Sequence, residues 1–145
     1  MSVRAVDHSV NIIAYRKNDK NYAMCCAWSM MVDYDKLVCL LGSQSVTGNM
    51  IKKGDIIGFS SLNDNQKDIA IKLGDGHSDN DNKLNDINYI MDDSAILIAE
   101  SRTLIKCEVI DILHLEGIEN DNLIYLKIIS FKENNGKFLH MSDFE

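Results

Sequence analysis

The sequence predicts a mainly β protein in which six or seven strands and two short helices form a barrel or a sandwich. Apolar runs rich in β-forming residues follow one another, and short polar turns separate them. The regular alternation of strand and helix that a parallel, doubly wound sheet requires does not occur. A barrel or a sandwich protects its own strand edges, which a short, mostly β chain needs.

Composition limits the function. A chain of 145 residues predicts one domain, residues 1–145, large enough for an ordinary core without disulfide or metal. The formal charge of −7 argues against a nucleic acid or an anionic membrane as partner. No apolar run approaches the roughly 18 residues that span a bilayer, and the first residues lack the apolar run of a signal peptide. We therefore expect a cytoplasmic protein.

The cysteines and histidines predict no metal site. Cys25, Cys26, Cys39 and Cys107 all lie in apolar runs, which favours buried thiols that act as small hydrophobic side chains. The four histidines are scattered, without a spacing typical of metal ligands or of a catalytic triad.

The first third of the chain predicts three strands. Residues 8–16 form the first, and the polar turn at 17–21 returns the chain into a second, residues 22–32. A turn at 33–35 then leads to a third strand over 36–42. The alternative for the second segment is a buried helix, because Ala and Met favour helix, but the polar turns on both sides favour a strand.

Two helices and a further strand follow. A short helix is predicted over residues 46–53, with Ser45 or Thr47 as its N-cap. Residues 55–62 form a strand, and a second helix covers 65–73. Gln66, Ile69, Ala70 and Leu73 share one face of this helix at helical spacing.

The last part returns to β structure. Residues 75–93, dense in Asp and Asn, predict an irregular excursion. Strands follow over 95–99, 104–116 and 123–131, with a last short strand near 138–140. The strand at 123–131 is apolar on both faces, so we expect a second subunit to cover one of them.

The predicted start of the first helix carries three hydroxyl side chains, those of Ser43, Ser45 and Thr47. The first amide groups of a helix lack intrahelical partners, and together with the helix dipole they attract anions. This pattern is compatible with a phosphate site. Simple N-capping is the alternative, and it would explain any one of these residues.

Two further segments have a functional and a structural interpretation. The small side chains of Cys25, Cys26 and Ala27, followed by Trp28, could border a planar ring, or the segment could be ordinary core strand. Ser78 with Lys83 could add a hydroxyl and a cation to an anion site, or both could be surface residues. Neither nucleotide-binding glycine fingerprint is present. Since no acid–base pair is apparent, an enzyme of this sequence would rely on a cofactor.

The order of these segments resembles the flavin reductase-like family of FMN-binding split barrels. Residues 21–28 (NYAMCCAW) are similar to the family segment N-x-M-T-A-S-W, and residues 45–47 (SVT) match its S-x-T helix start. The strand at 55–60 (DIIGFS) is similar to E-F-V-V-N-V, and residues 76–84 (GHSDNDNKL) to G…S-G-R-D-x-D-K-F. The similarity extends over residues 8–131.

This resemblance implies a Greek-key split β-barrel that forms a homodimer and binds FMN near the subunit interface, with FAD or riboflavin as alternatives. Cys25, Cys26, Ala27 and Trp28 would lie along the isoalloxazine. The phosphate would be held by Gln44, Ser45 and Thr47, with Ser78 and Lys83 contributing. The implied activity is NAD(P)H-dependent flavin reduction, which could supply reduced flavin to an oxygenase or another electron-accepting protein.

The chain departs from the family pattern at two of these places. Cysteines occupy positions 25 and 26, where many members have Thr or Ser, and Asp79-Asn80 replaces the family's Gly-Arg. Two alternatives therefore stay open. One is a flavin-carrying electron-transfer protein without nicotinamide chemistry, and the other is a related barrel that binds no flavin.

Overall fold

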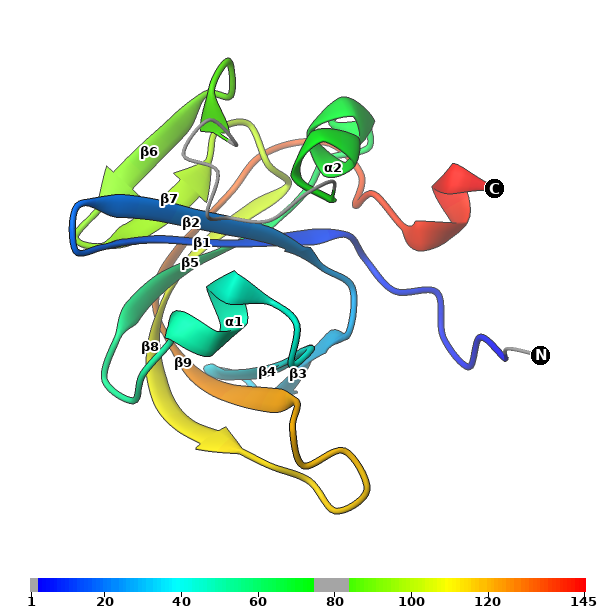
Figure 1. Ribbon diagram of the computed structural model, residues 1–145. Helices are drawn as coiled ribbons and strands as arrows, with labels where there is room; N and C mark the ends of the chain where they lie inside the picture. The colour runs from blue at the N-terminus through cyan, green and yellow to red at the C-terminus, as the bar shows by residue number, and fades with distance from the viewer. Residues whose placement is uncertain (1–2, 75–83) are drawn as a thin grey trace.

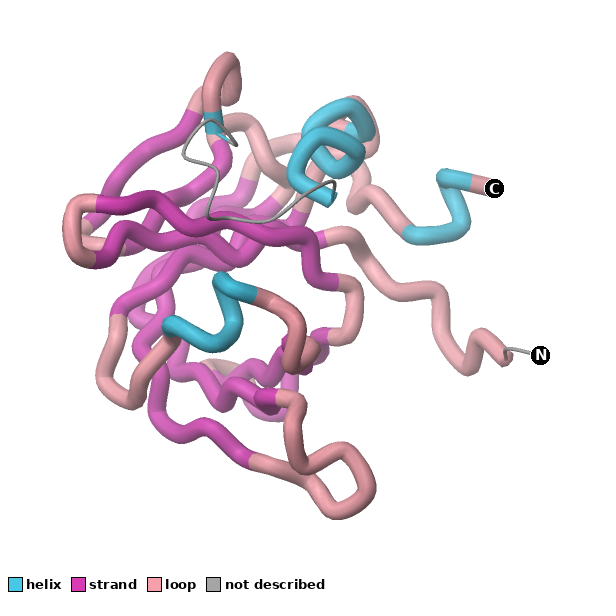
Figure 2. Tube along the Cα trace, viewed as in Figure 1, coloured by secondary structure: helices cyan, strands magenta, loops and turns pink. Residues whose placement is uncertain are grey.

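The computed structural model describes residues 3–74 and 84–145, and it confirms a mainly β architecture. A nine-stranded antiparallel sheet has the order β3-β4-β9-β8-β5-β1-β7-β6, with β2 paired to β1. The helices are short segments among these strands (Figure 2). The elements are β1 (Asn11–Lys17), β2 (Lys20–Cys26), β3 (Ser29–Asp33), β4 (Lys36–Leu41), α1 (Val46–Met50), β5 (Ile56–Ser61), α2 (Lys67–Gly74), β6 (Tyr89–Asp92), β7 (Ala95–Ile98), β8 (Thr103–Leu113), β9 (Asn122–Glu133) and the 3₁₀ helix Met141–Phe144.

The prediction of one strand over residues 22–32 is wrong, as is its helical alternative. The segment divides into the end of β2 and the whole of β3, because the chain changes its pairing partner. Cys26 still pairs with Asn11 of β1, whereas Ser29 pairs with Cys39 of β4. The Leu40 amide donates to the Trp28 carbonyl at 2.8 Å. We call residues 26–29 the β2–β3 break.

Three further predictions need correction. The section predicted as irregular contains β6, which pairs with β7, so the described residues form nine strands instead of six or seven. Helix α1 ends at Met50 instead of residue 53, because the Asp55 carboxylate accepts the Lys52 amide in a turn. The last predicted strand is reduced to isolated bridges of Phe138 and His140.

Two hydrophobic clusters hold the fold together. The first fills the barrel interior and the second lies between the strands and α2. The second includes Ala70 and Leu73, so the predicted buried face of α2 is confirmed. Helix α1 lies between the β1–β2 pair and the β3–β4 pair, on the opposite side of β1 and β2 from α2 (Figure 1). No helix among residues 3–74 and 84–145 is long and apolar enough to cross a membrane.

Candidate functional site

The end of β2, just before the β2–β3 break, lies against the turn between β4 and α1. The Ser45 hydroxyl donates to the Met24 sulfur at 3.0 Å, and the Thr47 hydroxyl donates to the Ala23 carbonyl at 3.4 Å. The fold therefore places Ala23 and Met24, which directly precede the predicted site residues 25–28, beside Ser45 and Thr47. Ser78 and Lys83, the other two predicted site residues, lie outside the described residues.

Two hydroxyls at the start of α1 bind the chain itself. Ser45 is the N-cap, and its Oγ accepts the Gly48 amide at 2.8 Å. Thr47 is buried, and its carbonyl accepts a hydrogen bond from the Tyr15 hydroxyl. Ser43 and Gln44, by contrast, are exposed at the tip of the turn. These last two side chains are available to a ligand in solution.

A carboxylate lies at the same turn. Asp121, from the loop before β9, accepts the Ser43 amide at 2.9 Å. The Asn49 side chain donates to the Ser43 carbonyl at 2.8 Å, and Asn122 donates to the Asn49 side chain at 3.0 Å. The turn is thereby fixed from two sides. A negative charge at this position opposes a phosphate that binds to the same amide groups.

The two adjacent cysteines turn their side chains to opposite sides of β2. Cys25 packs against the cluster beneath α2, whereas Cys26 belongs to the barrel interior. The Cys26 thiol donates weakly to the carbonyls of Trp28 and Leu40, at 3.7 and 3.9 Å. Both thiols therefore point into the packed layers, so what the break offers to a ring is its backbone. Beside it the Trp28 side chain is 63% exposed, an aromatic surface on which a planar ring can stack.

Two thiols of the barrel interior, those of Cys39 and Cys107, have raised pKa values. The pKa of Cys39 is raised by its hydrogen bond with Cys26 and by burial, and burial raises the pKa of Cys107 to about 12. Only the thiolate reacts efficiently, and these groups stay protonated at neutral pH. The site as described provides packing and hydrogen bonds, which agrees with chemistry supplied by a cofactor.

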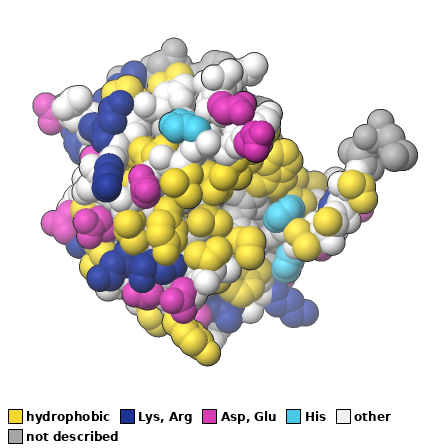
Figure 3. All heavy atoms as spheres, turned by 90° about the horizontal axis from the view of Figure 1, so that it is seen from below, with side chains coloured by type: hydrophobic (Ala, Val, Ile, Leu, Met, Phe, Trp, Pro, Cys, Tyr) yellow, Lys and Arg dark blue, Asp and Glu magenta, His cyan; other side chains and the backbone are white. Residues whose placement is uncertain are grey.

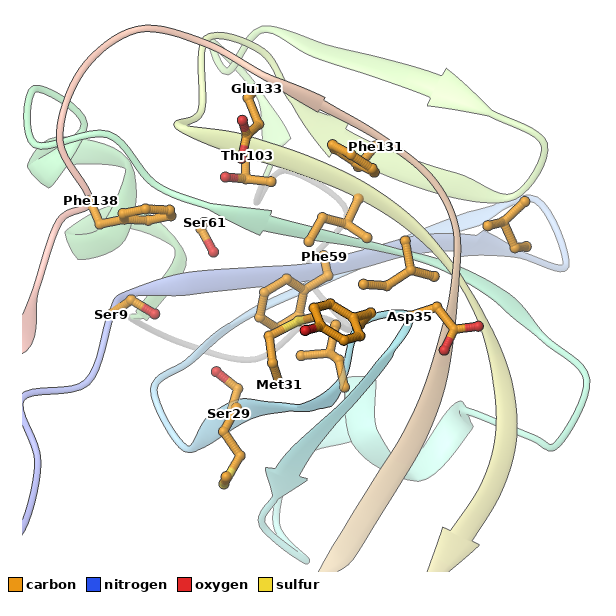
Figure 4. A pocket seen from close by; sticks show the side chains of 16 residues that line it. Ser9, Ser29, Met31, Asp35, Phe59, Ser61, Thr103, Phe131, Glu133 and Phe138 are labelled. Atoms are coloured by element: carbon orange, nitrogen blue, oxygen red, sulfur yellow. The ribbon is translucent and has the colours of Figure 1, made fainter.

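A groove of about 520 Å³ adjoins the break (Figure 4). It begins at Ser29, one residue after Trp28, and none of the predicted site residues in the described part of the chain lines it. Ser9, Ser29 and Ser61 lie on one side of it, and Phe131 and Asp35 lie on the other. The residues that line it are Ser9, Ser29, Met30, Met31, Tyr34, Asp35, Leu37, Phe59, Ser61, Thr103, Ile105, Ile128, Ile129, Phe131, Glu133 and Phe138.

The groove opens on an apolar surface. Met30 and Met31 of β3 are about half exposed or more, as are Ile129 and Phe131 of β9. Hydrophobic side chains form a broad band across the molecule in the view of Figure 3. Strand β3 ends the strand order of the sheet and pairs only with β4 among the described strands. The two-sided apolar pattern of β9 was the sequence signal for this surface, whereas sequence reasoning missed the groove.

A comparison over nearly the whole sequence shows the family. Residues 3–143 match the flavin reductase like domain. The chain belongs to the flavin reductase-like family. The resemblance inferred from the motifs is thus confirmed, over almost the entire length. No curated protein matches the sequence of this family member.

Solved structures of similar fold agree. An NADH:FAD oxidoreductase from Streptomyces globisporus superposes with a TM-score of 0.79 at 12% identity, covering 92% of this chain and 84% of its own. An FMN-binding protein from Thermus thermophilus gives a TM-score of 0.78 at 13% identity, with coverage of 94% and 83%. Nitrilotriacetate monooxygenase component B from Mycobacterium thermoresistibile gives 0.75 at 18%, with coverage of 91% and 72%. At these identities the likeness shows the fold, which is the predicted Greek-key split β-barrel.

Proposed function

We propose that this protein is a flavin reductase that binds FMN and uses NADH or NADPH to reduce it. The observation that supports this most is the contact of Ala23 and Met24, at the end of β2 just before the break, with the β4–α1 turn in a chain of the flavin reductase-like family. The flavin, when bound, supplies the redox chemistry. The protein's own contribution is to bind the ring and the phosphate, and to hold them in place.

The break fits the flat face of a flavin. Because Cys25 and Cys26 point into the packed layers and Ala27 is small, a ring can approach the backbone of this segment closely. Trp28 offers an exposed aromatic surface next to it. Hydroxyls at positions 25 and 26 are not needed for this arrangement, so the cysteines do not prevent it.

The turn before α1 fits the flavin phosphate through its exposed tip. Ser43 and Gln44 would contact the phosphate, while Ser45 and Thr47 hold the turn in shape through their bonds to Gly48 and Ala23. Ser78 and Lys83 would contribute a hydroxyl and a cation. The Asp121 carboxylate weakens the binding of an anion here, so riboflavin, which carries no phosphate, and FAD are the alternative ligands.

A second copy of the chain would cover the exposed surface of β3 and β9. Met30, Met31, Ile129 and Phe131 leave a contiguous apolar surface that monomeric proteins rarely expose. The free edge of β3 adjoins this surface. We expect a homodimer with the flavin near its interface. Its cysteines are thiols, in agreement with a reducing cytoplasm.

One neighbouring structure favours a particular role for reduced flavin. The monooxygenase component B among the structural neighbours suggests that this protein supplies reduced flavin to an oxygenase. The FMN-binding protein from Thermus thermophilus is named for flavin binding alone. The second candidate is therefore an electron carrier that binds flavin and uses no nicotinamide. The reductase and the electron carrier differ in one property: only the reductase has its bound flavin reduced by NADH or NADPH.

Stopped-flow absorbance decides between them. The protein with FMN should bleach the flavin band on mixing with NADH or NADPH, and oxygen should then sustain continuous turnover. A protein that binds FMN but is reduced only by a protein donor would be an electron carrier. Absence of turnover with either nucleotide and with FMN, FAD or riboflavin would exclude the reductase.

A further inference from the structure

A buried asparagine lies directly beneath the β2–β3 break. Asn11, at the start of β1, is fully buried, and its amide joins three strands. Its Oδ1 accepts hydrogen bonds from Ser61 at 2.6 Å and from Ser9 at 3.2 Å. Its Nδ2 donates to the Cys26 carbonyl at 3.1 Å and to the Ser29 hydroxyl oxygen at 2.8 Å. One side chain thus binds both ends of the break.

The direction of these hydrogen bonds is determined by the Cys26 carbonyl. A carbonyl can only accept, so the nitrogen of the Asn11 amide must face the break. The Ser29 oxygen therefore accepts from Asn11, and its own proton points elsewhere. Among the described residues this proton has no acceptor, and Ser29 lines the groove (Figure 4).

We propose that Asn11 is a positioning residue for the ligand site: it holds the β2–β3 break in place and directs the Ser29 hydroxyl proton into the groove. There the hydroxyl donates to an oxygen of the bound ligand, a carbonyl or a carboxamide, which the flavin ring and the nicotinamide both carry. The identity of this ligand rests on the proposed function. The structural part of the inference, that Asn11 holds the break in place, is independent of it.

The surroundings favour this role over simple packing. The neighbouring residues Ile12 and Ile13 are fully buried apolar side chains, and an apolar residue at position 11 would avoid the cost of burying an amide. The amide is acceptable because each of its groups is hydrogen-bonded. An amide bonded in this way determines one arrangement of the connected segments, which an apolar side chain cannot do.

The test compares the same substitution at two buried asparagines. Asn11→Asp keeps the size and the acceptor oxygen but loses both donors to the break. Asn63→Asp is the matched control, because Asn63 is also buried and donates to two carbonyls, those of Glu100 and Asn135, which lie outside the break. Trp28, the only tryptophan, reports on the break without any ligand. FMN titration reports on the site.

Both variants should lose stability, but only Asn11→Asp should shift the Trp28 emission, and it should raise the FMN dissociation constant at least tenfold. Ser29→Ala removes the proposed donor and should raise either the FMN dissociation constant or the KM for the nicotinamide at least threefold. Its shift in Trp28 emission should be smaller than that of Asn11→Asp, because Asn11 still binds the Cys26 carbonyl. If Asn11→Asp fails to fold, Ser29→Ala and Ser61→Ala carry the test. Ser61→Ala leaves the donors of Asn11 in place and should change flavin affinity less than Ser29→Ala.

Equal Trp28 emission in Asn11→Asp and Asn63→Asp would overturn the claim that Asn11 holds the break in place. Flavin affinity and KM within twofold of the parent in Ser29→Ala would overturn the role of its hydroxyl. A parent protein that binds no flavin would contradict the proposed function and the ligand half of this inference, whereas the Trp28 comparison would still judge the structural half.

Discussion

The Tyr15 hydroxyl donates a hydrogen bond of 2.5 Å to the backbone carbonyl of Thr47 across the barrel interior. Tyr15 belongs to β1 and Thr47 to α1, so this bond ties the helix to the sheet. Burial raises the pKa of Tyr15 well above its usual value, with smaller contributions from Tyr22 and Asp55. The hydroxyl therefore keeps its proton and remains a donor over the whole physiological pH range.

Tyr15→Phe should lower the free energy of unfolding by about 1–3 kcal/mol, because it leaves the Thr47 carbonyl without this donor. The ring still stacks on Tyr22, so packing is kept. Urea denaturation followed by circular dichroism measures the change. Tyr22→Phe is the control, since the Tyr22 hydroxyl has no hydrogen-bond partner among the described residues. Equal losses in both variants would show that the bond to Thr47 contributes little.

Asp121→Asn should strengthen FMN binding and leave riboflavin binding unchanged. The substitution removes a negative charge beside the Ser43 amide, while the asparagine oxygen can still accept that amide. We expect a gain of several-fold for FMN at low salt, which decreases at high ionic strength. Fluorescence titration of both flavins measures the ratio. An equal gain in riboflavin affinity would contradict this prediction, because it would show that Asp121 does not act on the phosphate.

Phe131→Glu should convert the proposed dimer into monomers. Phe131 is 67% exposed on the surface of β9 that we expect the second copy to cover, and a buried unpaired carboxylate is costly. Sedimentation velocity measures the molecular mass. Ile71→Glu is the matched control, because Ile71 is 56% exposed on α2, on another part of the surface. A parent protein that sediments as a monomer at micromolar concentration would contradict the dimer.

Gly58→Ala should destabilise the fold by about 3 kcal/mol or more, or prevent folding. A Cβ at this position of β5 would lie 2.0 Å from the Ile96 carbonyl oxygen of β7, and neither backbone can yield easily. Gly42→Ala is the control, since its Cβ would meet no atom within 4 Å. Thermal unfolding of the two variants should differ by many degrees. A Gly58→Ala protein as stable as the control would contradict the close crossing of β5 and β7.

Alkylation should distinguish folded from unfolded thiols. Because the pKa of Cys107 is raised from 9.0 to about 12, its thiolate fraction at pH 8 is roughly a thousandfold lower in the folded state. Iodoacetamide should therefore leave Cys39 and Cys107 unlabelled in the native protein and label both in denaturant, as read by mass spectrometry. Since the folded thiol binds its proton more tightly, stability should fall as pH rises above about 9. Rapid native labelling of Cys107 would contradict its burial.

Local patterns were sufficient for most of the fold. The buried face of α2 and the long final pair of strands followed from periodicity and polar turns. The β2–β3 break could not be predicted, because Ser29 is the single polar residue there and Met30, Met31 and Val32 continue the apolar run after it. Its cause is non-local, since β1 and β4 compete for the same segment. Strand β6 was missed within an Asp-rich section, although Asp93, with a φ of 53°, marks the turn into β7.

The candidate site was only partly predictable. Motif order assigned residues 25–28 and 43–47 to one site, and in the fold the preceding residues Ala23 and Met24 contact Thr47 and Ser45. Asp121 reaches Ser43 across 78 positions of sequence, and no local pattern announces such a contact. The groove and Asn11 were missed for the same reason, because residues from five different strands meet there. An asparagine inside an apolar strand is the one signal that could have drawn attention to it.

Flavin titration of the purified protein tests the central claim most directly. The account predicts that FMN binds at about one molecule per protomer, with quenched flavin fluorescence and a shifted visible absorption band, and that Trp28 emission changes as the site fills. Failure of FMN, FAD and riboflavin to bind at any accessible concentration would contradict it. The split barrel would then be only a scaffold for another function.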